Sequence, residues 1–156
     1  MKKNKLLFGG ILLLVVVGII AIYNISGDDT YSRDSNSISE PEKIVLKYFN
    51  SWNDKDYNYM YTVLSDGFKK IDPYAINFDS FEKYSSSQGI NGVEVNSIKG
   101  GLNNGKVANV DYSVNFILDN GNSIPFNSSF TLKYRENDKN PGWKLIHPYG
   151  ENVDIS

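Results

Sequence analysis

The chain of 156 residues contains no cysteine. This absence excludes disulfides, thiol nucleophiles, thiolate metal sites and a lipid anchor on cysteine. The only histidine is His147, and the zinc, calcium-loop and serine-hydrolase patterns are missing as well. We therefore expect no metal and no cofactor, and the sequence assigns no catalytic residue.

An excess of positive charge is also missing. After position 27 the chain carries 18 acidic and 13 basic residues, which gives this part a net charge of −5. Proteins that bind nucleic acids or anionic polymers present a positive field to them. We therefore expect no nucleic-acid partner.

A long apolar run lies near the start of the chain. Residues 6–25, LLFGGILLLVVVGIIAIYNI, carry no charge and are long enough to cross a bilayer as a helix. Residues 1–5 hold three lysines, which favour a cytoplasmic N-terminus. A cleaved signal peptide is the alternative, but the exit AIYNISG lacks the small-residue cleavage pattern. We predict a single-pass anchor in the cell membrane, with the lipid bilayer as a partner and the C-terminal domain extracellular.

The segment after this run is small and polar. Residues 26–38, SGDDTYSRDSNSI, hold too little apolar surface to fold, so we predict a flexible linker. Residues 39–156 remain for the extracytoplasmic domain, and this length supports one core without disulfides.

The first part of this domain has the periodicity of helices. Ser39-Glu40-Pro41-Glu42 matches a capping box with a tolerated proline. An apolar stripe follows at helical spacing, made by Ile44, Val45, Tyr48, Phe49 and Trp52. A second helix is predicted up to residues 65–67, with Tyr57, Met60, Tyr61 and Leu64 on its buried face. A short third helix is expected between Asp79 and Gly89.

From residue 93 onward the apolar period becomes two. It predicts strands near residues 93–95, 108–118, 124–135 and 143–147. Asp119-Asn120-Gly121-Asn122 is typical of a tight turn between antiparallel strands. We therefore predict an α+β fold, with helices packed on one face of an antiparallel sheet of about four strands.

Two segments resemble the nuclear transport factor 2-like superfamily: EPEKIVLKYFNSWNDKDYNYMYTVLSDGFK at the front and GWKLIHP at the back. The resemblance implies a cone, in which a strongly bent sheet wraps around the N-terminal helix hairpin and the short third helix, often with a pocket at the open end. The layout is similar to the small membrane-anchored extracytoplasmic members of Gram-positive bacteria. The superfamily also includes isomerases, dehydratases and transport adaptors, and no subfamily motif is present that would transfer a catalytic role.

Four residues are candidates for lining such a pocket. His147 follows Trp143 and Leu145 by steps of two, so it should face inward near the end of the last strand. It could act as a general base, line the pocket or simply end the strand. Tyr61, Tyr112 and Tyr134 should lie between the helices and the sheet, where filling the core is the plain alternative. The inward positions offer His147 tyrosines but no evident carboxylate partner.

Three hypotheses for function follow. The first is an accessory domain without enzymatic activity that binds a partner protein in the cell envelope. The second is a small-molecule-binding or isomerase-like enzyme that uses the cone pocket. The third is a secretion or conjugation subunit that self-associates through its sheet, since the sequence leaves the oligomeric state open.

Overall fold

The computed structural model describes residues 38–148 of the chain. The predicted cytoplasmic tail and membrane helix, nearly all of the linker, and residues 149–156 lie outside these residues. Among residues 38–148, no helix is both long enough and apolar enough to cross a bilayer. The described residues form an α+β fold of four helices and a four-stranded antiparallel sheet.

Helix α2 (Glu40–Asp54) begins as predicted from its capping residues. The Ser39 backbone N–H donates a 2.8 Å hydrogen bond to Glu42 Oε2, and the Ser39 hydroxyl donates to the same oxygen at 2.7 Å. Val45, Tyr48, Phe49 and Trp52 are buried along one side of this helix. The stripe read from the sequence therefore is the face that packs on the sheet.

The helices after α2 are shorter and more numerous than predicted. They are α3 (Tyr57–Thr62), α4 (Asp66–Ile71) and α5 (Phe78–Ser86). Helix α4 was not predicted, because Ser65-Asp66-Gly67 was interpreted as a helix end. Ser65 instead caps α4, since its hydroxyl accepts a 2.9 Å hydrogen bond from Phe68 N. The cap of α5 is Asn77, two residues earlier than expected.

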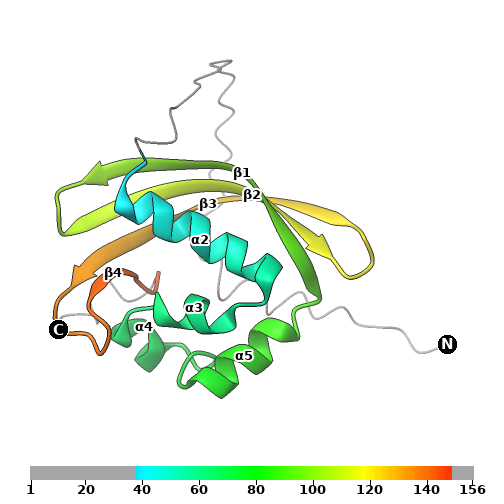
Figure 1. Cartoon of the computed structure of the whole chain (residues 1–156), viewed down its shortest axis with the longest axis horizontal. Helices are drawn as coiled ribbons and strands as arrows, with labels where there is room; N and C mark the ends of the chain where they lie inside the picture. Colours follow the sequence, from blue (N-terminus) through cyan, green and yellow to red (C-terminus); the bar gives the residue numbers. More distant parts are fainter. Residues whose placement is uncertain (1–37, 149–156) are drawn as a thin grey trace, which may run out of the picture.

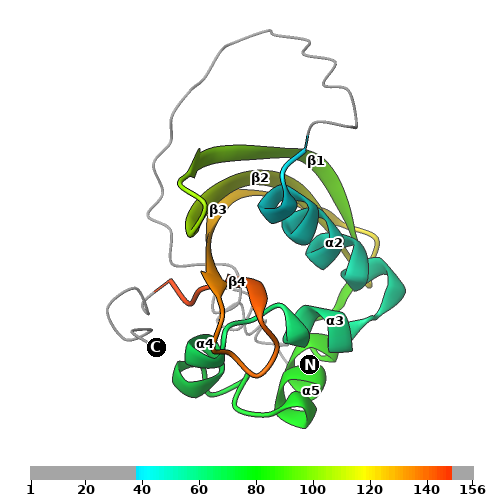
Figure 2. The same cartoon turned by 60° about the vertical axis from the view of Figure 1, so that its left-hand side comes forward.

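The sheet is a simple meander of β1 (Ile90–Asn103), β2 (Val107–Leu118), β3 (Ser123–Arg135) and β4 (Gly142–Leu145). Register shifts interrupt the pairing of β1 with β2 at three places. Such irregularities bend a strand and increase its twist. The sheet curves around α2, while α3, α4 and α5 lie across its open side (Figures 1 and 2).

The last strand is joined to the chain between α3 and α4 as well as to β3. Leu145 N donates to Val63 O at 2.8 Å, and Ser65 N donates to Leu145 O at 3.0 Å. Because both bonds continue the sheet hydrogen bonding beyond its edge strand, they hold the start of α4 beside the end of β4. This contact sets the position of His147.

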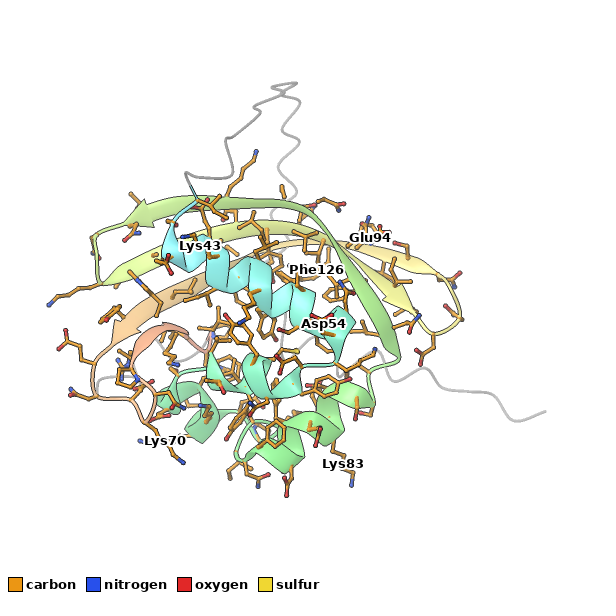
Figure 3. All side chains as sticks on the ribbon, viewed as in Figure 1. Lys43, Asp54, Lys70, Lys83, Glu94 and Phe126 are labelled. Carbon is orange, nitrogen blue, oxygen red and sulfur yellow. The ribbon has the colours of Figure 1, made fainter. Side chains whose placement is uncertain are left out.

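Aromatic rings fill the space between α2 and the concave face of the sheet. Tyr112 of β2 lies 4.8 Å from both Phe49 of α2 and Phe130 of β3, measured between ring centroids. Phe126 extends the same layer toward the other end of the sheet, 6.2 Å from Tyr112 (Figure 3). The ring layer therefore fills the space between α2 and the concave face of the sheet.

Candidate functional site

His147 lies next to a buried carboxylate that the sequence did not reveal. Its Nε2 is 3.8 Å from Asp72 Oδ2, and the two residues are 4% and 1% exposed. Asp72 ends α4 and accepts a 2.8 Å hydrogen bond from Tyr74 N with its other oxygen, Oδ1. The expectation that His147 has no carboxylate partner was therefore wrong. The irregular segment after α4 carries this partner to the end of β4.

The surroundings of His147 favour its neutral form. Burial lowers the pKa of the imidazole, and the negative charge of Asp72 opposes this shift. The ring packs edge-on against Phe68 of α4, with 4.8 Å between the ring centroids. Because burial is the larger effect, His147 is uncharged near neutral pH and can accept a proton.

Several side-chain polar atoms, one of them on Asp72, are buried without a hydrogen-bond partner. Among the described residues they are Trp52 Nε1, Asp72 Oδ2, Tyr84 Oη, Ser85 Oγ and Tyr112 Oη. Trp52 Nε1 lies close to the Tyr48 hydroxyl but does not reach hydrogen-bonding geometry. Asp72, Tyr84 and Tyr112 also act electrostatically on Tyr48. Tyr48 is thus the centre of this group, which we call the buried polar cluster: Tyr48, Trp52, Asp72, Tyr84, Tyr112 and His147.

The tyrosines of the buried polar cluster stay protonated. Burial raises the pKa of Tyr84 to about 12, with the charges of Tyr74 and Asp72 adding to the effect. Burial likewise raises the pKa of Tyr48 and of Tyr112 far above the ordinary value. Each hydroxyl is therefore a hydrogen-bond donor at any physiological pH.

The four pocket-lining candidates do not meet in one place. His147 and Tyr112 belong to the buried polar cluster, and Tyr112 is 3% exposed. Tyr61 borders a surface hollow next to Lys69 and Phe78. Tyr134 borders a different hollow of ≈ 680 Å³, near the start of α2.

The prediction that Tyr134 lies between the helices and the sheet was wrong. Tyr134 is 47% exposed, although Leu132 on the same face of β3 is fully buried. The alternation of β3 continues, because Tyr134 pairs with Trp143 just as Leu132 pairs with Leu145. Helix α2 starts too late to cover this end of the strand, so the inward face becomes surface there.

The chemistry available to the buried polar cluster is proton transfer and hydrogen bonding. A neutral imidazole beside a carboxylate is a general-base arrangement, and tyrosine hydroxyls can donate to a carbonyl oxygen. Within residues 38–148 there is no group of three or more His, Asp or Glu side chains placed to hold a metal ion. The arrangement offers acid–base groups and hydrogen-bond donors.

The residues that sequence analysis missed here are Asp72, Tyr84 and the polar ends of Tyr48 and Trp52. Tyr48 and Trp52 follow each other at a helical step of four, and this spacing was used to assign them to the core. Asp72 stands before Pro73 in a segment without periodicity. The only hint in the sequence was that Asp72 is a charged residue in the segment between two predicted helices, which does not indicate burial.

Comparisons with known proteins bear on the fold. No protein-family model and no curated protein matches the chain. The structure is similar to a SEC-C motif containing protein from Psychrobacter arcticus, with a TM-score of 0.50 and 14% sequence identity. That match covers 70% of this chain and 59% of the Psychrobacter chain, so this chain spans little more than half of that protein.

A second solved structure is a more distant neighbour. It is described as an NTF2-like transpeptidase from Campylobacter jejuni, and the match has a TM-score of 0.41 and 13% identity over 69% of this chain and 98% of that one. Identities this low bear on the arrangement of helices and strands and not on chemistry. The similarity to the Psychrobacter structure therefore supports a shared arrangement of helices and strands, and it says nothing about activity.

Proposed function

We propose that this chain is a membrane-anchored accessory domain on the outer face of the cell membrane, where it binds a partner protein of the envelope. The anchor rests on the apolar run of residues 6–25 and the lysines before it. The proposal also assigns the domain to the nuclear transport factor 2-like superfamily, in the small anchored type of Gram-positive bacteria. The curved sheet around α2 supports this fold assignment (Figure 2).

The observation that carries the accessory role is the filling of the concave face. Tyr48 and Phe130 make an edge-to-face contact at 5.7 Å, and Phe49 lies 6.0 Å from Phe130. A small-molecule enzyme that works inside the cone needs a pocket with a few hundred cubic ångströms of open space. Two hollows of ≈ 680 and ≈ 780 Å³ lie instead on the outside, and charged side chains contribute to the lining of both. Charged groups at such hollows can make the hydrogen bonds and ion pairs that are typical of the polar rim of a protein interface.

Photo-crosslinking in intact cells tests this role. A crosslinking amino acid is placed in the full chain at Ile76 or Leu102, which are 64% and 83% exposed. We expect a discrete crosslinked protein from at least one position, and digestion of the domain by protease added outside the cells. The variant His147→Gln should keep the crosslink. Protection from external protease, or loss of the crosslink in a folded His147→Gln variant, would contradict the proposal.

The buried polar cluster favours a second candidate, a small-molecule-binding or isomerase-like enzyme. Neutral His147 would take a proton from a carbon next to a carbonyl, and Tyr48 or Tyr84 would donate a hydrogen bond to the carbonyl oxygen. The observation that supports it is that Asp72 Oδ2 and Tyr84 Oη are buried without a hydrogen bond. Deuterium exchange at such carbons of simple ketones, followed by NMR, tests it. Exchange that depends on His147 supports the enzyme, and exchange equal to that of His147→Gln contradicts it.

A further inference from the structure

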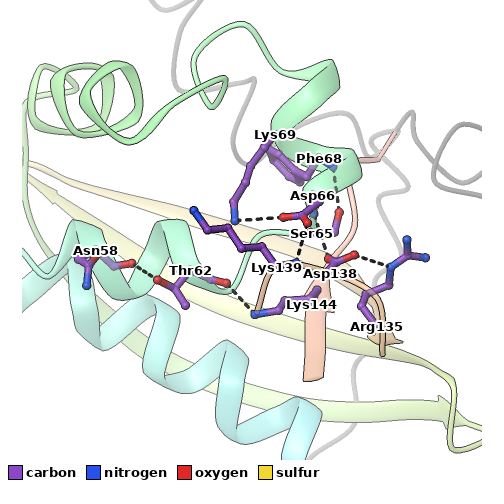
Figure 4. A network of polar contacts seen from close by, with 10 residues as sticks. All are labelled: Asn58, Thr62, Ser65, Asp66, Phe68, Lys69, Arg135, Asp138, Lys139 and Lys144. Carbon is purple, nitrogen blue, oxygen red and sulfur yellow. Dashed lines mark hydrogen bonds and ion pairs between the residues drawn. The ribbon is translucent and has the colours of Figure 1, made fainter. Parts of the chain in front are cut away.

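A hollow of ≈ 780 Å³ lies on the helical side of the molecule, away from the buried polar cluster. It is bordered by α3, α4, the segment leading to α5 and the loop between β3 and β4. Lys69, Lys70 and Lys139 all reach it. We call it the lysine hollow. Figure 4 shows Lys69 and Lys139 side by side around Asp66, although they come from distant parts of the chain.

The two acids near these lysines are already engaged. Asp66 Oδ2 accepts a 2.8 Å hydrogen bond from Lys139 N, and Asp138 Oδ2 accepts one of 3.0 Å from Asp66 N. Asp138 Oδ1 also pairs with Arg135 Nε at 3.3 Å. The Lys69 ammonium reaches Asp66 Oδ1 only at 3.8 Å. The carboxylates thus brace the loop against α4, and the lysine hollow keeps an excess of positive charge.

Lys69 is held in place, which distinguishes it from a freely moving surface lysine. Its side chain is 15% exposed, and its Nζ lies 4.5 Å from the centroid of the Tyr61 ring. Behind it, Lys144 is 6% exposed and donates a 2.8 Å hydrogen bond to Thr62 O. Burial lowers the pKa of both lysines, and the charge of Lys69 lowers that of Lys144 further. An anion entering the lysine hollow would relieve this crowding of positive charge.

One side of the lysine hollow is apolar. Ile76 is 64% exposed, and it lines the lysine hollow together with Phe78. The Phe78 ring lies 5.8 Å from Tyr61, so the aromatic wall continues under the lysines. A ligand that fits both halves must carry negative charge and an apolar group close together.

We propose that the lysine hollow binds an acidic peptide segment of the partner protein, with carboxylates against Lys69, Lys70 and Lys139 and an apolar side chain against Ile76 and Phe78. This inference rests on the proposed accessory function and names the chemistry of its partner. Phosphodiester polymers fit less well, because they offer nothing to the apolar wall and the chain as a whole has a net charge of −2. Because these positive charges are gathered at the lysine hollow, they complement a short acidic segment and not a long polyanion.

Binding of a fluorescein-labelled peptide, in which glutamates flank a central leucine, tests the proposal by fluorescence anisotropy. The full chain is used in neutral detergent. The double variant Lys69→Gln/Lys139→Gln should weaken binding about tenfold or more, and raising the salt concentration should weaken binding to the parent chain. Ile76→Ser, or glycine in place of the peptide leucine, should weaken binding severalfold.

The matched control is Lys83→Gln/Lys99→Gln, because both lysines are exposed and lie outside the lysine hollow. Lys83 and Lys70 project from opposite ends of the helical side (Figure 3). The control should bind as the parent does. Equal losses in both double variants, or an inorganic polyphosphate that competes as well as the peptide does, would overturn the proposal in favour of unselective attraction of polyanions.

The two proposals can fail separately. If Lys69→Gln/Lys139→Gln keeps its crosslinked partner in cells and binds the peptide as the parent does, the partner uses another surface and only the inference about the lysine hollow is overturned. If the parent chain gives no crosslinked partner at any position, the accessory function itself fails. Loss of both the crosslink and the peptide in this double variant, with the control unaffected, supports both.

Discussion

Glu42 Oε1 accepts a 2.8 Å hydrogen bond from Gly100 N, which ties the first turn of α2 to β1. The other carboxylate oxygen of Glu42 receives the Ser39 N–H, so one buried side chain both caps the helix and anchors it to the sheet. Burying a carboxylate is favourable only when hydrogen bonds satisfy it. Glu42 is therefore a structural carboxylate, in contrast to Asp72, whose Oδ2 faces His147 without a hydrogen bond.

Replacing Glu42 by alanine should destabilise the fold strongly. We expect Glu42→Ala to lower the free energy of unfolding by about 2–3 kcal/mol, because buried hydrogen bonds to a charged acceptor are lost. Urea denaturation of the full chain measures this change. The control is Glu40→Ala, which removes an exposed ion pair with Lys43 and should cost no more than about 0.5 kcal/mol. Equal effects of the two variants would contradict the anchoring role.

Two adjacent glycines in β1 should respond differently to alanine. A Cβ at Gly100 would lie 2.9 Å from Glu42 Cδ, whereas a Cβ at Gly101 would be 3.5 Å or more from its neighbours. We expect Gly100→Ala to cost about 1–2 kcal/mol by displacing Glu42, and Gly101→Ala to be nearly neutral. In a double-mutant cycle, Gly100→Ala should cost much less when Glu42 is already alanine. Additive effects would show that the clash lies elsewhere.

Stability should decrease in mild acid because of His147. Its pKa in the folded protein is lowered below the ordinary 6.5, so the unfolded chain binds a proton more readily than the folded one. The contribution of His147 to stability is complete above pH 6.5 and decreases as the pH drops from there toward the pKa of the folded state. Urea midpoints measured between pH 7.5 and 5 should show this decrease. His147→Gln should flatten the profile in that range, and an unchanged slope would show that another group is responsible.

Removing the hydroxyl of Tyr112 tests whether a water molecule or a ligand is bound in the buried polar cluster in solution. The buried hydroxyl lies close to Ser128 but does not reach hydrogen-bonding geometry, so Tyr112→Phe should leave stability unchanged or raise it by up to about 1 kcal/mol. Tyr112→Leu should cost about 2–4 kcal/mol, since the ring contacts with Phe49 and Phe130 are lost. Thermal or urea denaturation measures both. A clear loss for Tyr112→Phe would mean that the hydroxyl binds water or a ligand, which favours the second candidate function.

Local patterns were sufficient for most of the fold. The capping residues and apolar stripe predicted α2, and the turn at residues 119–122 with its flanking alternation predicted the β2–β3 hairpin. These features are determined within a few residues of sequence, where periodicity and turn chemistry act. Helix α4 was missed because a serine, an aspartate and a glycine in a row indicate a helix end as readily as a helix start.

The candidate site could be predicted only in part for a different reason. His147 was assigned to the inward face of the last strand from its spacing to Trp143 and Leu145. It is buried, but β4 ends at Leu145, so His147 lies just beyond the strand. Its neighbour Asp72 belongs to an irregular segment, whose position depends on the hydrogen bonds between Leu145 and the chain before α4. Tyr134 follows the predicted alternation, but the length of α2 leaves it exposed. Neither the proximity of Asp72 to His147 nor the exposure of Tyr134 can be read from the spacing of residues in the sequence.

The sequence by itself determined the helix and strand periodicity, the absence of thiol chemistry, and the apolar run that predicts a membrane anchor. Its composition and spacing act over short stretches of chain, so they carry this information directly. Only the tertiary structure decided which polar groups meet, placing Asp72 beside His147 and gathering Lys69, Lys70 and Lys139 around one hollow. These groups come together because the packed aromatic rings and the hydrogen bonds of β4 to the chain before α4 hold segments that are distant in sequence side by side. A local sequence pattern contains no information about such contacts.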